Sequence, residues 1–417
     1  MTFAPRGIGG LLSVLFLASG PALGSDGDSG RYAIRAGKIV TVDKAGTVHD
    51  NGVLLISDGK IEALGRARDV AIPDGYEEVV VPNLWAVPGM VEPHNHVGGS
   101  LQDLNDGVYL SNPGLRTLDV VEPGNPNTLN CIAGGVTTVL LIPGSGNNMS
   151  GFGTLVKTGG GTVDEVLLRY PGSLKIAQSG NPERYWYRVA RSFMNFNTRD
   201  TLLRAKEYHE AWTAHEDGKG PKPDHNPALE DFRGLFRHDF PTSVHTQIYQ
   251  VVQKTITMQH DELGLSVMLD HSTFDAFLLG KETVKRGMYV MNGPRQIHFE
   301  RKDRKIFGNA SQWWAIGEGK QLLGVNTDSP VIPQEMLPLQ CAMAVHFGMP
   351  QTHGLAAVTR IPAEGLKISD RVGSLEAGKD ADIALWTGDP IDPSSACLKV
   401  FVDGRIAYCA KRDGRRF

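Results

Sequence analysis

Apolar and polar positions alternate with a period of two near both ends of the chain. Residues 31–85 show this alternation in several short runs, and the Asp-Gly pair at 58–59 separates two of them. A period of two is typical of strands with one buried face, and Asp-Gly is typical of a hairpin turn. The same pattern returns at residues 382–386 and 398–408, with a second Asp-Gly pair at 403–404. We predict that the two ends meet in one small β-sandwich.

The middle of the chain, residues 88–372, has a different pattern of apolar and polar positions. Short apolar runs, which indicate buried strands, are separated by stretches with helical periodicity. Strands that alternate with helices form parallel sheets. Several such units in a segment of this length predict an α/β fold, a (β/α)₈ TIM-like barrel. The clearest apolar runs cover residues 84–91, 137–142, 173–177, 243–246, 265–271, 287–291 and 322–328.

Three segments between these runs need a separate interpretation. Residues 183–240 are rich in charged and aromatic side chains, and we predict a long helix over Thr198–His215 followed by a surface loop. This insertion is either a solvated helix or a lid that contributes to substrate choice. The Gly-rich segment 143–153 is an active-site loop or a plain turn, because no Gly-Lys-Ser/Thr follows to make a phosphate loop. Residues 292–295 end a predicted strand and are a candidate for lining a pocket.

The first residues have the pattern of a secretory signal peptide. Arg6 precedes an apolar run from Ile8 to Ala18, and small residues at Ala22 and Gly24 precede a cleavage point. An uncleaved membrane anchor is the alternative, but the apolar run is short for a membrane span. We therefore expect a mature protein that is periplasmic or secreted. The predicted division is a signal peptide at 1–24, a composite β-sandwich from 25–87 and 373–417, and a barrel domain at 88–372.

Composition narrows the class of protein. Apolar residues make up 41% of the chain and charged residues 21%, which is ordinary for a globular protein. The net charge is −4 and no basic stripe is present, so we expect no nucleic-acid partner, and no membrane contact after cleavage. Cys397 and Cys409 lie close enough in sequence for a hairpin disulfide in an exported protein. Cys131 and Cys341 lie in apolar, helical settings and are expected to be buried thiols. The sequence leaves open whether the protein forms a homo-oligomer.

The candidate chemistry begins with His94 and His96. They stand two positions apart at the end of the apolar run 84–91, and residues two apart on a strand point to the same face. Both imidazoles can therefore bind one metal ion. A chance core or surface pair is the alternative for a lone His-x-His.

Four more polar residues follow apolar runs in the same manner: Lys175, His245, His271 and Asp328. The carboxyl ends of barrel strands are where barrel enzymes place their chemistry. Zinc prefers imidazole nitrogen and carboxylate oxygen as ligands. Taken singly, each histidine also fits a hydrogen-bonded core position, and Lys175 fits an ordinary salt-bridged lysine. Taken together, they predict one metal site.

These motifs resemble the amidohydrolase superfamily, in its hydantoinase- and imidazolonepropionase-like branch. Residues 87–96, Val-Pro-Gly-Met-Val-Glu-Pro-His-Asn-His, look like the first-strand signature Pro-Gly-hydrophobic-Ile-Asp-x-His-x-His. Residues 173–177 resemble the stretch whose lysine is carboxylated in the hydantoinase-like branch. Residues 325–330 resemble the eighth-strand aspartate segment, and residues 371–386 are similar to the return of the chain into the small sandwich.

The resemblance implies a role for each candidate. His94 and His96 would bind the more buried metal, and His245 and His271 would match the fifth- and sixth-strand histidines. Asp328 would be a metal ligand and the catalytic base. Lys175 would bridge two ions as a carbamate, since an ammonium has no lone pair to give and its own strand carries no acidic residue. The implied cofactor is one or two divalent ions, with zinc as first choice and manganese or iron as alternatives.

The resulting functional hypothesis is an exported, metal-dependent hydrolase of an amide-type C–N bond in a small molecule. A cyclic amide, an N-acyl amino acid and a dipeptide are the candidate substrates. One alternative keeps the site and changes the bond to that of an ester, a lactone or a phosphotriester. The other is a catalytically inactive, amidohydrolase-like binding protein. Sequence does not separate the two hydrolases, because substrate choice lies in the loops between strands.

Overall fold

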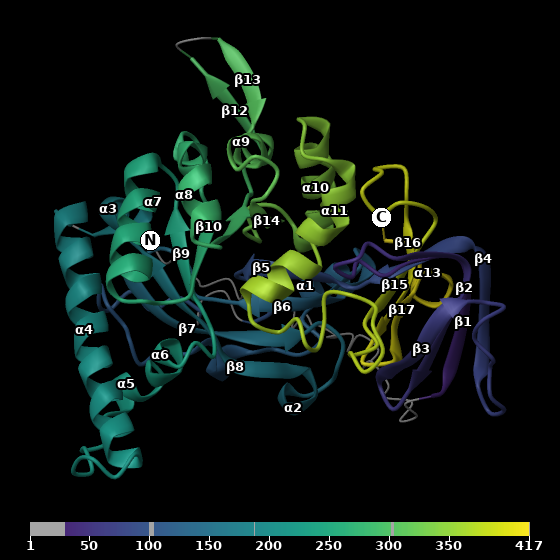
Figure 1. The fold of residues 1–417 in the computed structure, drawn as a ribbon, viewed down its shortest axis with the longest axis horizontal. Helices are drawn as coiled ribbons and strands as arrows, with labels where there is room; N and C mark the ends of the chain where they lie inside the picture. The colour runs from purple at the N-terminus through teal and green to yellow at the C-terminus, as the bar shows by residue number, and fades with distance from the viewer. Residues whose placement is uncertain (1–29, 100–103, 187, 302–303, 417) are drawn as a thin grey trace, which may run out of the picture.

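The computed structural model describes residues 30–99, 104–186, 188–301 and 304–416, so the predicted signal peptide lies outside the described residues. Two large sheets organise this part of the chain, one eight-stranded and one seven-stranded. Figure 1 shows them side by side, with most helices around the eight-stranded sheet. No helix of the described residues combines the length and the apolar character that a membrane span requires.

The eight-stranded sheet is a nearly closed barrel, as predicted. Strand β5 (Met90–Asn95), which carries His94, and the segment after β14 (Leu322–Val325) meet at a bridge between Asn95 and Ser329. The side chain of Glu92 strengthens this closure, because it accepts hydrogen bonds from the backbone and hydroxyl of Thr327. In spatial order the strands are β14 (Leu322–Val325), β11 (Tyr289–Asn292), β10 (Val267–His271), β9 (Thr242–Thr246), β8 (Leu167–Ala177), β7 (Met149–Lys157), β6 (Val136–Leu141) and β5 (Met90–Asn95).

Helices and short helical turns connect the barrel strands and cover the outside of the sheet. Most of them bury one face against it, as expected for βα units, but the short helices Pro227–Glu230 and Ala410–Asp413 bury no residue. In chain order the helices are α1 (Pro126–Ala133), α2 (Val163–Val166), α3 (Asn181–Tyr185), α4 (Arg191–Glu216), α5 (Pro227–Glu230), α6 (Arg233–Phe236), α7 (Tyr249–Thr255), α8 (Gly280–Lys285), α9 (Asn309–Ile316), α10 (Leu337–His346), α11 (Gln351–Ala357), α12 (Arg360–Gly365) and α13 (Ala410–Asp413).

One strand departs from a uniformly parallel barrel. The second half of the Gly-rich segment 143–153 is the start of β7, which pairs antiparallel with both β6 and β8. Glycine permits this pairing, since a Cβ on Gly153 would lie 2.4 Å from Ile142 Cγ2. The expectation of a loop or turn therefore holds only for residues 143–148, because close backbone approach, not flexibility, accounts for the later glycines.

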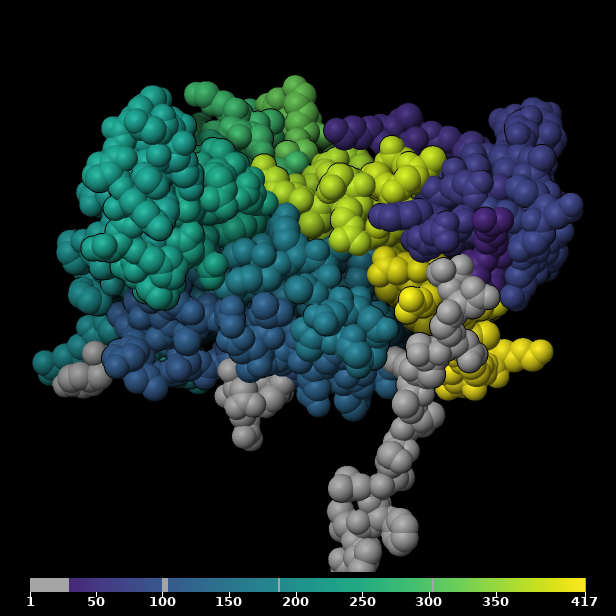
Figure 2. Space-filling model, turned by 90° about the horizontal axis from the view of Figure 1, so that it is seen from below, coloured from purple at the N-terminus to yellow at the C-terminus, as the bar shows by residue number. Residues whose placement is uncertain are grey.

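Both chain ends contribute to the seven-stranded sheet. Its order is β17 (Arg405–Cys409), β16 (Cys397–Val402), β15 (Ile383–Trp386), β4 (Glu77–Pro88), β1 (Tyr32–Val40), β2 (Val48–Ser57) and β3 (Lys60–Arg66). The first part of the long strand β4 pairs with β1, and its last part pairs with β15. Strand β4 therefore joins the expected sandwich layers into one continuous sheet. Figure 2 shows the purple N-terminal and yellow C-terminal segments in contact on one face.

The cysteines are free thiols. Cys409 pairs with Lys399 across the β16–β17 ladder, so Cys397 lies two residues farther along its strand. The hairpin disulfide between Cys397 and Cys409 is therefore wrong for this structure, because the strand register keeps them apart. Cys131 and Cys341 are buried, as predicted.

The insertion forms the long helix α4, which begins seven residues earlier than predicted. Figure 1 shows α4 standing along the outer side of the barrel, with α5 and α6 next to its C-terminal half. A second insertion is the hairpin of β12 (Ile297–Glu300) and β13 (Lys305–Gly308), which projects from the molecule in the same view. The prediction of a solvated helix or a lid is not decided by this arrangement.

Candidate metal centre

The six predicted ligands all come from the carboxyl ends of barrel strands. His94 is near the end of β5 and His96 follows it, while Lys175 lies near the end of β8. His245, His271 and Asp328 belong to the ends of β9, β10 and β14 in the same way. The barrel therefore gathers residues that are up to 234 positions apart, since 328 − 94 = 234.

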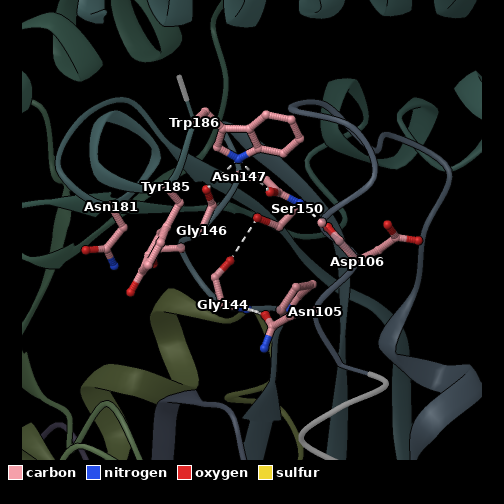
Figure 3. A pocket seen from close by; sticks show the side chains of 12 residues that line it. Asn105, Asp106, Gly144, Gly146, Asn147, Ser150, Asn181, Tyr185 and Trp186 are labelled. Atoms are coloured by element: carbon pink, nitrogen blue, oxygen red, sulfur yellow. Dashed lines mark hydrogen bonds between the residues drawn. The ribbon is translucent and has the colours of Figure 1, made fainter. Parts of the chain in front are cut away.

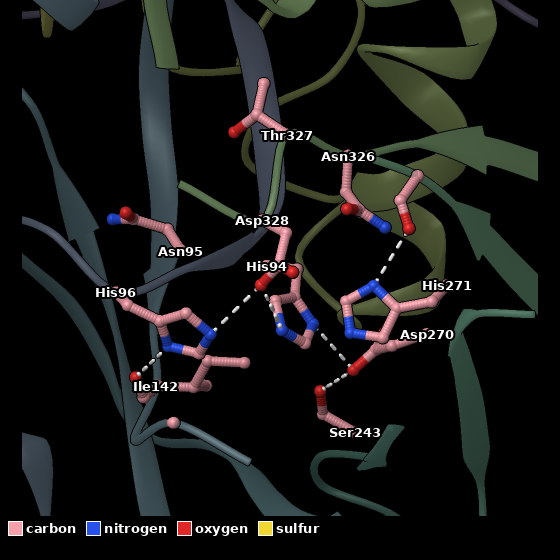
Figure 4. Close-up of polar contacts among 12 residues, drawn as sticks. His94, Asn95, His96, Ile142, Ser243, Asp270, His271, Asn326, Thr327 and Asp328 are labelled. Atoms are coloured by element: carbon pink, nitrogen blue, oxygen red, sulfur yellow. Dashed lines mark hydrogen bonds and ion pairs between the residues drawn. The ribbon is translucent and has the colours of Figure 1, made fainter. Parts of the chain in front are cut away.

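The carboxylate of Asp328 contacts both His94 and His96. Its Oδ1 atom lies 3.3 Å from His94 Nε2 and 3.2 Å from His96 Nε2. The side chain of His94 is fully buried, whereas that of Asp328 keeps 18% of its surface exposed. Figure 4 shows the carboxylate between the two rings. Asp328 is thus the acidic group on the open side of the site.

The other ring nitrogens hold the imidazoles in place. His96 Nδ1 lies 2.8 Å from the carbonyl oxygen of Ile142, and His271 Nδ1 lies 2.9 Å from that of Gly293. A carbonyl oxygen only accepts, so each Nδ1 carries the proton and each Nε2 keeps its lone pair. The predicted pocket segment 292–295 therefore reaches the site through the Gly293 backbone.

His271 and His245 complete the cluster. The ring centroids of His94 and His271 are 4.5 Å apart, and those of His245 and His271 are 4.6 Å apart. His271 Nε2 and both His245 nitrogens are buried without a hydrogen-bond partner in the described structure. Buried polar atoms are almost always satisfied, so such a group of orphan nitrogens indicates a ligand.

Lys175 points into this cluster. Its Nζ atom lies 2.9 Å from His94 Nε2, and the side chain is fully buried. Burial lowers the pKa of Lys175 to about 8, although Asp270 and Asp328 oppose that shift. A neutral amine is therefore much more accessible here than on a solvated lysine.

Burial also keeps most of the imidazoles neutral. It lowers the pKa of His271 to about 4 and lowers that of His245 well below its usual value. Burial opposes the ionisation of Asp328, but neighbouring imidazoles, His271 first, hold its pKa well below the usual range. The cluster therefore presents neutral nitrogen donors beside a carboxylate, the donor set that zinc prefers.

Two supporting residues were missed by the sequence analysis. Asp270 is fully buried, and its Oδ2 atom lies 2.9 Å from His94 Nδ1 without good hydrogen-bond alignment. Ser243 donates a hydrogen bond to the same oxygen (Figure 4). Glu92 accepts a hydrogen bond of 3.1 Å from the His94 backbone. An acidic residue inside an apolar strand is the signal that would have identified both carboxylates.

The backbone at the site is unusual in two places. His271 has a φ of 62° and Asp328 a φ of 51°, both in the left-handed region. Residues with side chains adopt this region at a cost of about 1–3 kcal/mol, and they cluster at functional sites. Here the turn lets Asp270 and His271, which alternate on a regular strand, both reach His94.

Atoms of His94, His271 and Asp328 lie within 4.8 Å of one another, close enough to share one ion. The orphan nitrogens, the fixed tautomers and the carboxylate all fit a divalent metal.

The chain is similar in sequence and in fold to proteins of the amidohydrolase family. Residues 311–407, which include Asp328 and the return into the end sheet, match the model of the amidohydrolase family. The crystal structure of an amidohydrolase from Thermotoga maritima superposes with a TM-score of 0.81 at 25% identity, covering 91% of this chain and all of that one.

The family-model match and the similarity along the whole fold together support membership of the amidohydrolase superfamily.

Two curated members of the superfamily align along most of the chain. Amidohydrolase tasK of Hapsidospora irregularis is 25% identical over 397 residues, which cover 86% of this chain but only 39% of that protein. Imidazolonepropionase of Brucella anthropi is 24% identical over 363 residues, which cover 81% of this chain and 87% of that protein. The relationship to the superfamily therefore spans both the barrel and the end sheet, while the shared length differs between relatives.

Proposed function

We propose that this amidohydrolase-superfamily protein is a metal-dependent hydrolase that cleaves an amide-type C–N bond in a small molecule. The observation that carries the proposal is that His94 and His96 contact the partly exposed carboxylate of Asp328, with His271 within 4.8 Å of it. The similarity to proteins named imidazolonepropionase and amidohydrolase supports hydrolysis of the same class of bond.

The metal would be held by His94, His96, His245, His271 and Asp328, with zinc as first choice and manganese or iron as alternatives. A bound divalent ion lowers the pKa of water and polarises a carbonyl group. The protein's own part is to orient the donors: Asp270 behind His94 and the Gly293 carbonyl behind His271 restrict ring rotation.

Asp328 is the proposed general base. Its carboxylate is ionised at neutral pH, lies on the open side of the site and is within 3.3 Å of His94 and His96. It can accept a proton from a water molecule and return it to the leaving nitrogen, as a positioned carboxylate does in acid–base catalysis.

Lys175 is the proposed carbamate. The lone pair of its neutral amine would add to carbon dioxide, and one proton would leave to give an anionic carboxylate on the lysine. Two observations support this role: Nζ lies 2.9 Å from His94 Nε2, and β8 carries no acidic side chain. An unmodified ammonium would oppose cations at this position.

The experiment has two arms. Zinc- or manganese-loaded protein is screened against cyclic amides, N-acyl amino acids, dipeptides, esters and lactones, and its metal content is measured. Amide turnover that requires bound metal supports the proposal. Turnover of esters alone favours the ester or lactone alternative, and bound metal without any turnover favours the inactive binding protein.

The carbamate is tested with Lys175→Ala. We expect loss of turnover and of one metal equivalent, with partial recovery of both on addition of formate or acetate. Full turnover in Lys175→Ala contradicts the carbamate, and a single-metal site that uses His94, His96 and Asp328 then becomes the better account.

Export remains part of the proposal. It is supported by the signal-peptide pattern of residues 1–24. Mass spectrometry of the native protein should find an N-terminus near Ser25, whereas an intact Met1 in a membrane fraction would contradict export.

A further inference from the structure

A cavity of about 590 Å³ is lined by loops at the carboxyl end of the barrel. Its walls come from residues 105–107, from the loop after β6 and from residues 181–186 after β8 (Figure 3). Cavities of about 300–1,000 Å³ typically hold small-molecule ligands. The volume is therefore suited to the part of a substrate that does not react.

Two loops connect this cavity directly to the metal centre. The Ile142 carbonyl holds His96, and the next residue, Pro143, lines the cavity. A Cβ on Gly180 would lie 3.7 Å from His245 Nε2, and the next residue, Asn181, also lines the cavity. Consecutive Cα atoms are about 3.8 Å apart, so these two wall residues lie directly after residues that contact His96 and His245.

Hydrogen bonds fix the walls. The Trp186 indole donates to the Gly146 carbonyl at 3.1 Å and to Asn147 Oδ1 at 3.2 Å. The Ser150 hydroxyl donates to the Gly144 carbonyl at 2.8 Å, as Figure 3 shows. The cavity is thus largely formed before a ligand enters, which reduces the ordering cost of binding.

The chemistry of the walls is polar but without positive charge. No lysine, arginine or histidine is among the described residues that line the cavity, and Asp106 is their one charged side chain. Asn105 Oδ1 accepts a hydrogen bond from the Gly144 backbone, which leaves its amide NH₂ for a ligand. The exposed aromatic ring of Tyr185 adds an apolar face.

We propose that this cavity binds the non-reacting part of the amide substrate and selects an uncharged, hydrogen-bonding group over a carboxylate. A carboxylate would lose its hydration without gaining a cationic partner, and it would meet the negative charge of Asp106. An amide or heterocycle instead finds matching groups at Asn105, Asn181 and Tyr185. This inference rests on the proposed hydrolase function and narrows its substrate class.

The test uses a panel of N-acetyl amino acids and their matched C-terminal carboxamides with zinc-loaded protein. We expect kcat/KM at least tenfold higher for the carboxamides, mainly through KM. Asn181→Arg adds a guanidinium that can pair with a carboxylate and should reduce this preference at least fivefold. Ala71→Arg, at an exposed position before β4, adds the same charge elsewhere and should leave the preference unchanged.

Isothermal titration calorimetry of the same pairs separates recognition from hydrolysis. Carboxamides that bind at least tenfold tighter but are not cleaved contradict the hydrolase function and retain the selectivity of the cavity. A preference below threefold, or tighter binding of the carboxylates, overturns the inference and leaves the hydrolase function standing if the panel is cleaved.

Discussion

Among the described residues, Lys157 and Lys175 are buried on neighbouring barrel strands, and their surroundings differ completely. Lys157 on β7 lies 3.0 Å from Asp380, 2.7 Å from Asp382 and 3.2 Å from Asp403. Lys175 on β8 instead meets the Nε2 atom of His94. Relative exposure is 2% for Lys157 and 0% for Lys175, so burial does not distinguish them.

The partners reverse the effect of burial. Burial alone lowers the pKa of a lysine, but the carboxylates, Asp382 first, raise the pKa of Lys157 above its usual value. The more distant Asp270 and Asp328 do not achieve this for Lys175, whose pKa falls to about 8. Lys157 therefore stays an ammonium, whereas the neutral amine of Lys175 becomes accessible near pH 8.

The two clusters also differ in completeness. The cluster around Lys157 joins β7 of the barrel to the end sheet, and Lys60 and Arg371 add further ion contacts to Asp380. The cluster around Lys175 leaves nitrogens of His245 and His271 without partners. In the Lys157 cluster Asp380 Oδ2 also lacks a hydrogen bond, but it lies 3.0 Å from Lys157 and 2.8 Å from Arg371. Buried groups paired with opposite charges stabilise a fold, whereas buried nitrogens without any partner indicate a missing ligand.

The largest predicted effect concerns catalysis. Asp328→Asn removes the proton acceptor but keeps an oxygen near the metal, so kcat should fall by about 10²–10⁴-fold while metal content is largely retained. Steady-state kinetics and elemental analysis measure both. Asp382→Asn in the other cluster is the matched control and should leave kcat within about twofold. Equal losses in both variants would break the distinction between the clusters.

The two lysines give the sharpest test of stability. Lys157→Met leaves Asp382 and Asp403 without their cation, while Asp380 keeps Lys60 and Arg371. Breaking a buried pair in this way costs about 3–5 kcal/mol. Lys175→Met removes a poorly compensated amine, so the metal-free protein should lose less than about 1 kcal/mol or gain stability. Denaturant unfolding of both metal-free variants measures the difference. A larger loss for Lys175→Met would contradict the comparison.

The sequence alone predicted that the side chains of the candidate site lie together, and their role as metal ligands stays a prediction. The order of apolar runs located Lys175, His245, His271 and Asp328, because parallel strands bring their carboxyl ends to one rim. It did not locate Asp270, because regular alternation predicts that Asp270 and His271 point to opposite faces. The left-handed backbone at His271 changes that alternation, and no local residue pattern predicts this backbone conformation.

The fold, too, was predicted from the sequence in part and missed in part. Alternating strands and helices predicted the barrel, and hairpin signals at both ends predicted their common sheet. The antiparallel strand β7 was missed, because its glycines are typical of a loop when considered without the neighbouring strands. The predicted Cys397–Cys409 disulfide was wrong because the strand register keeps the two residues apart. Register depends on side-chain packing across two strands and not on sequence distance.

A smaller effect is expected at the residue behind the ligands. Asp270→Asn keeps the size of the side chain but weakens its charge-assisted contact with His94 Nδ1. Such supporting groups typically change metal affinity by about 10–100-fold. Competition with a chromogenic chelator measures the affinity. An unchanged affinity would show that Asp270 does not orient His94.

The smallest predicted effect is the pH dependence of the closed cluster. Burial opposes ionisation of Asp380, but Lys157 and Lys60 lower its pKa below the usual value of 3.8. The stabilisation is thus present above pH 3.8 and is lost as pH falls through the lower folded-state value. The difference in unfolding free energy between wild type and Asp380→Asn should shrink from pH 6 toward pH 3. A constant difference would contradict this assignment.

Anomalous diffraction at the zinc edge, from crystals of the zinc-loaded protein, tests the central claim most directly. The account predicts an anomalous peak about 2.0–2.2 Å from ring nitrogens of His94, His96 and His271. It predicts no peak among Lys157, Asp380, Asp382 and Asp403. A zinc-loaded crystal without a peak at the three histidines, or with its peak in the Lys157 cluster, would contradict the account.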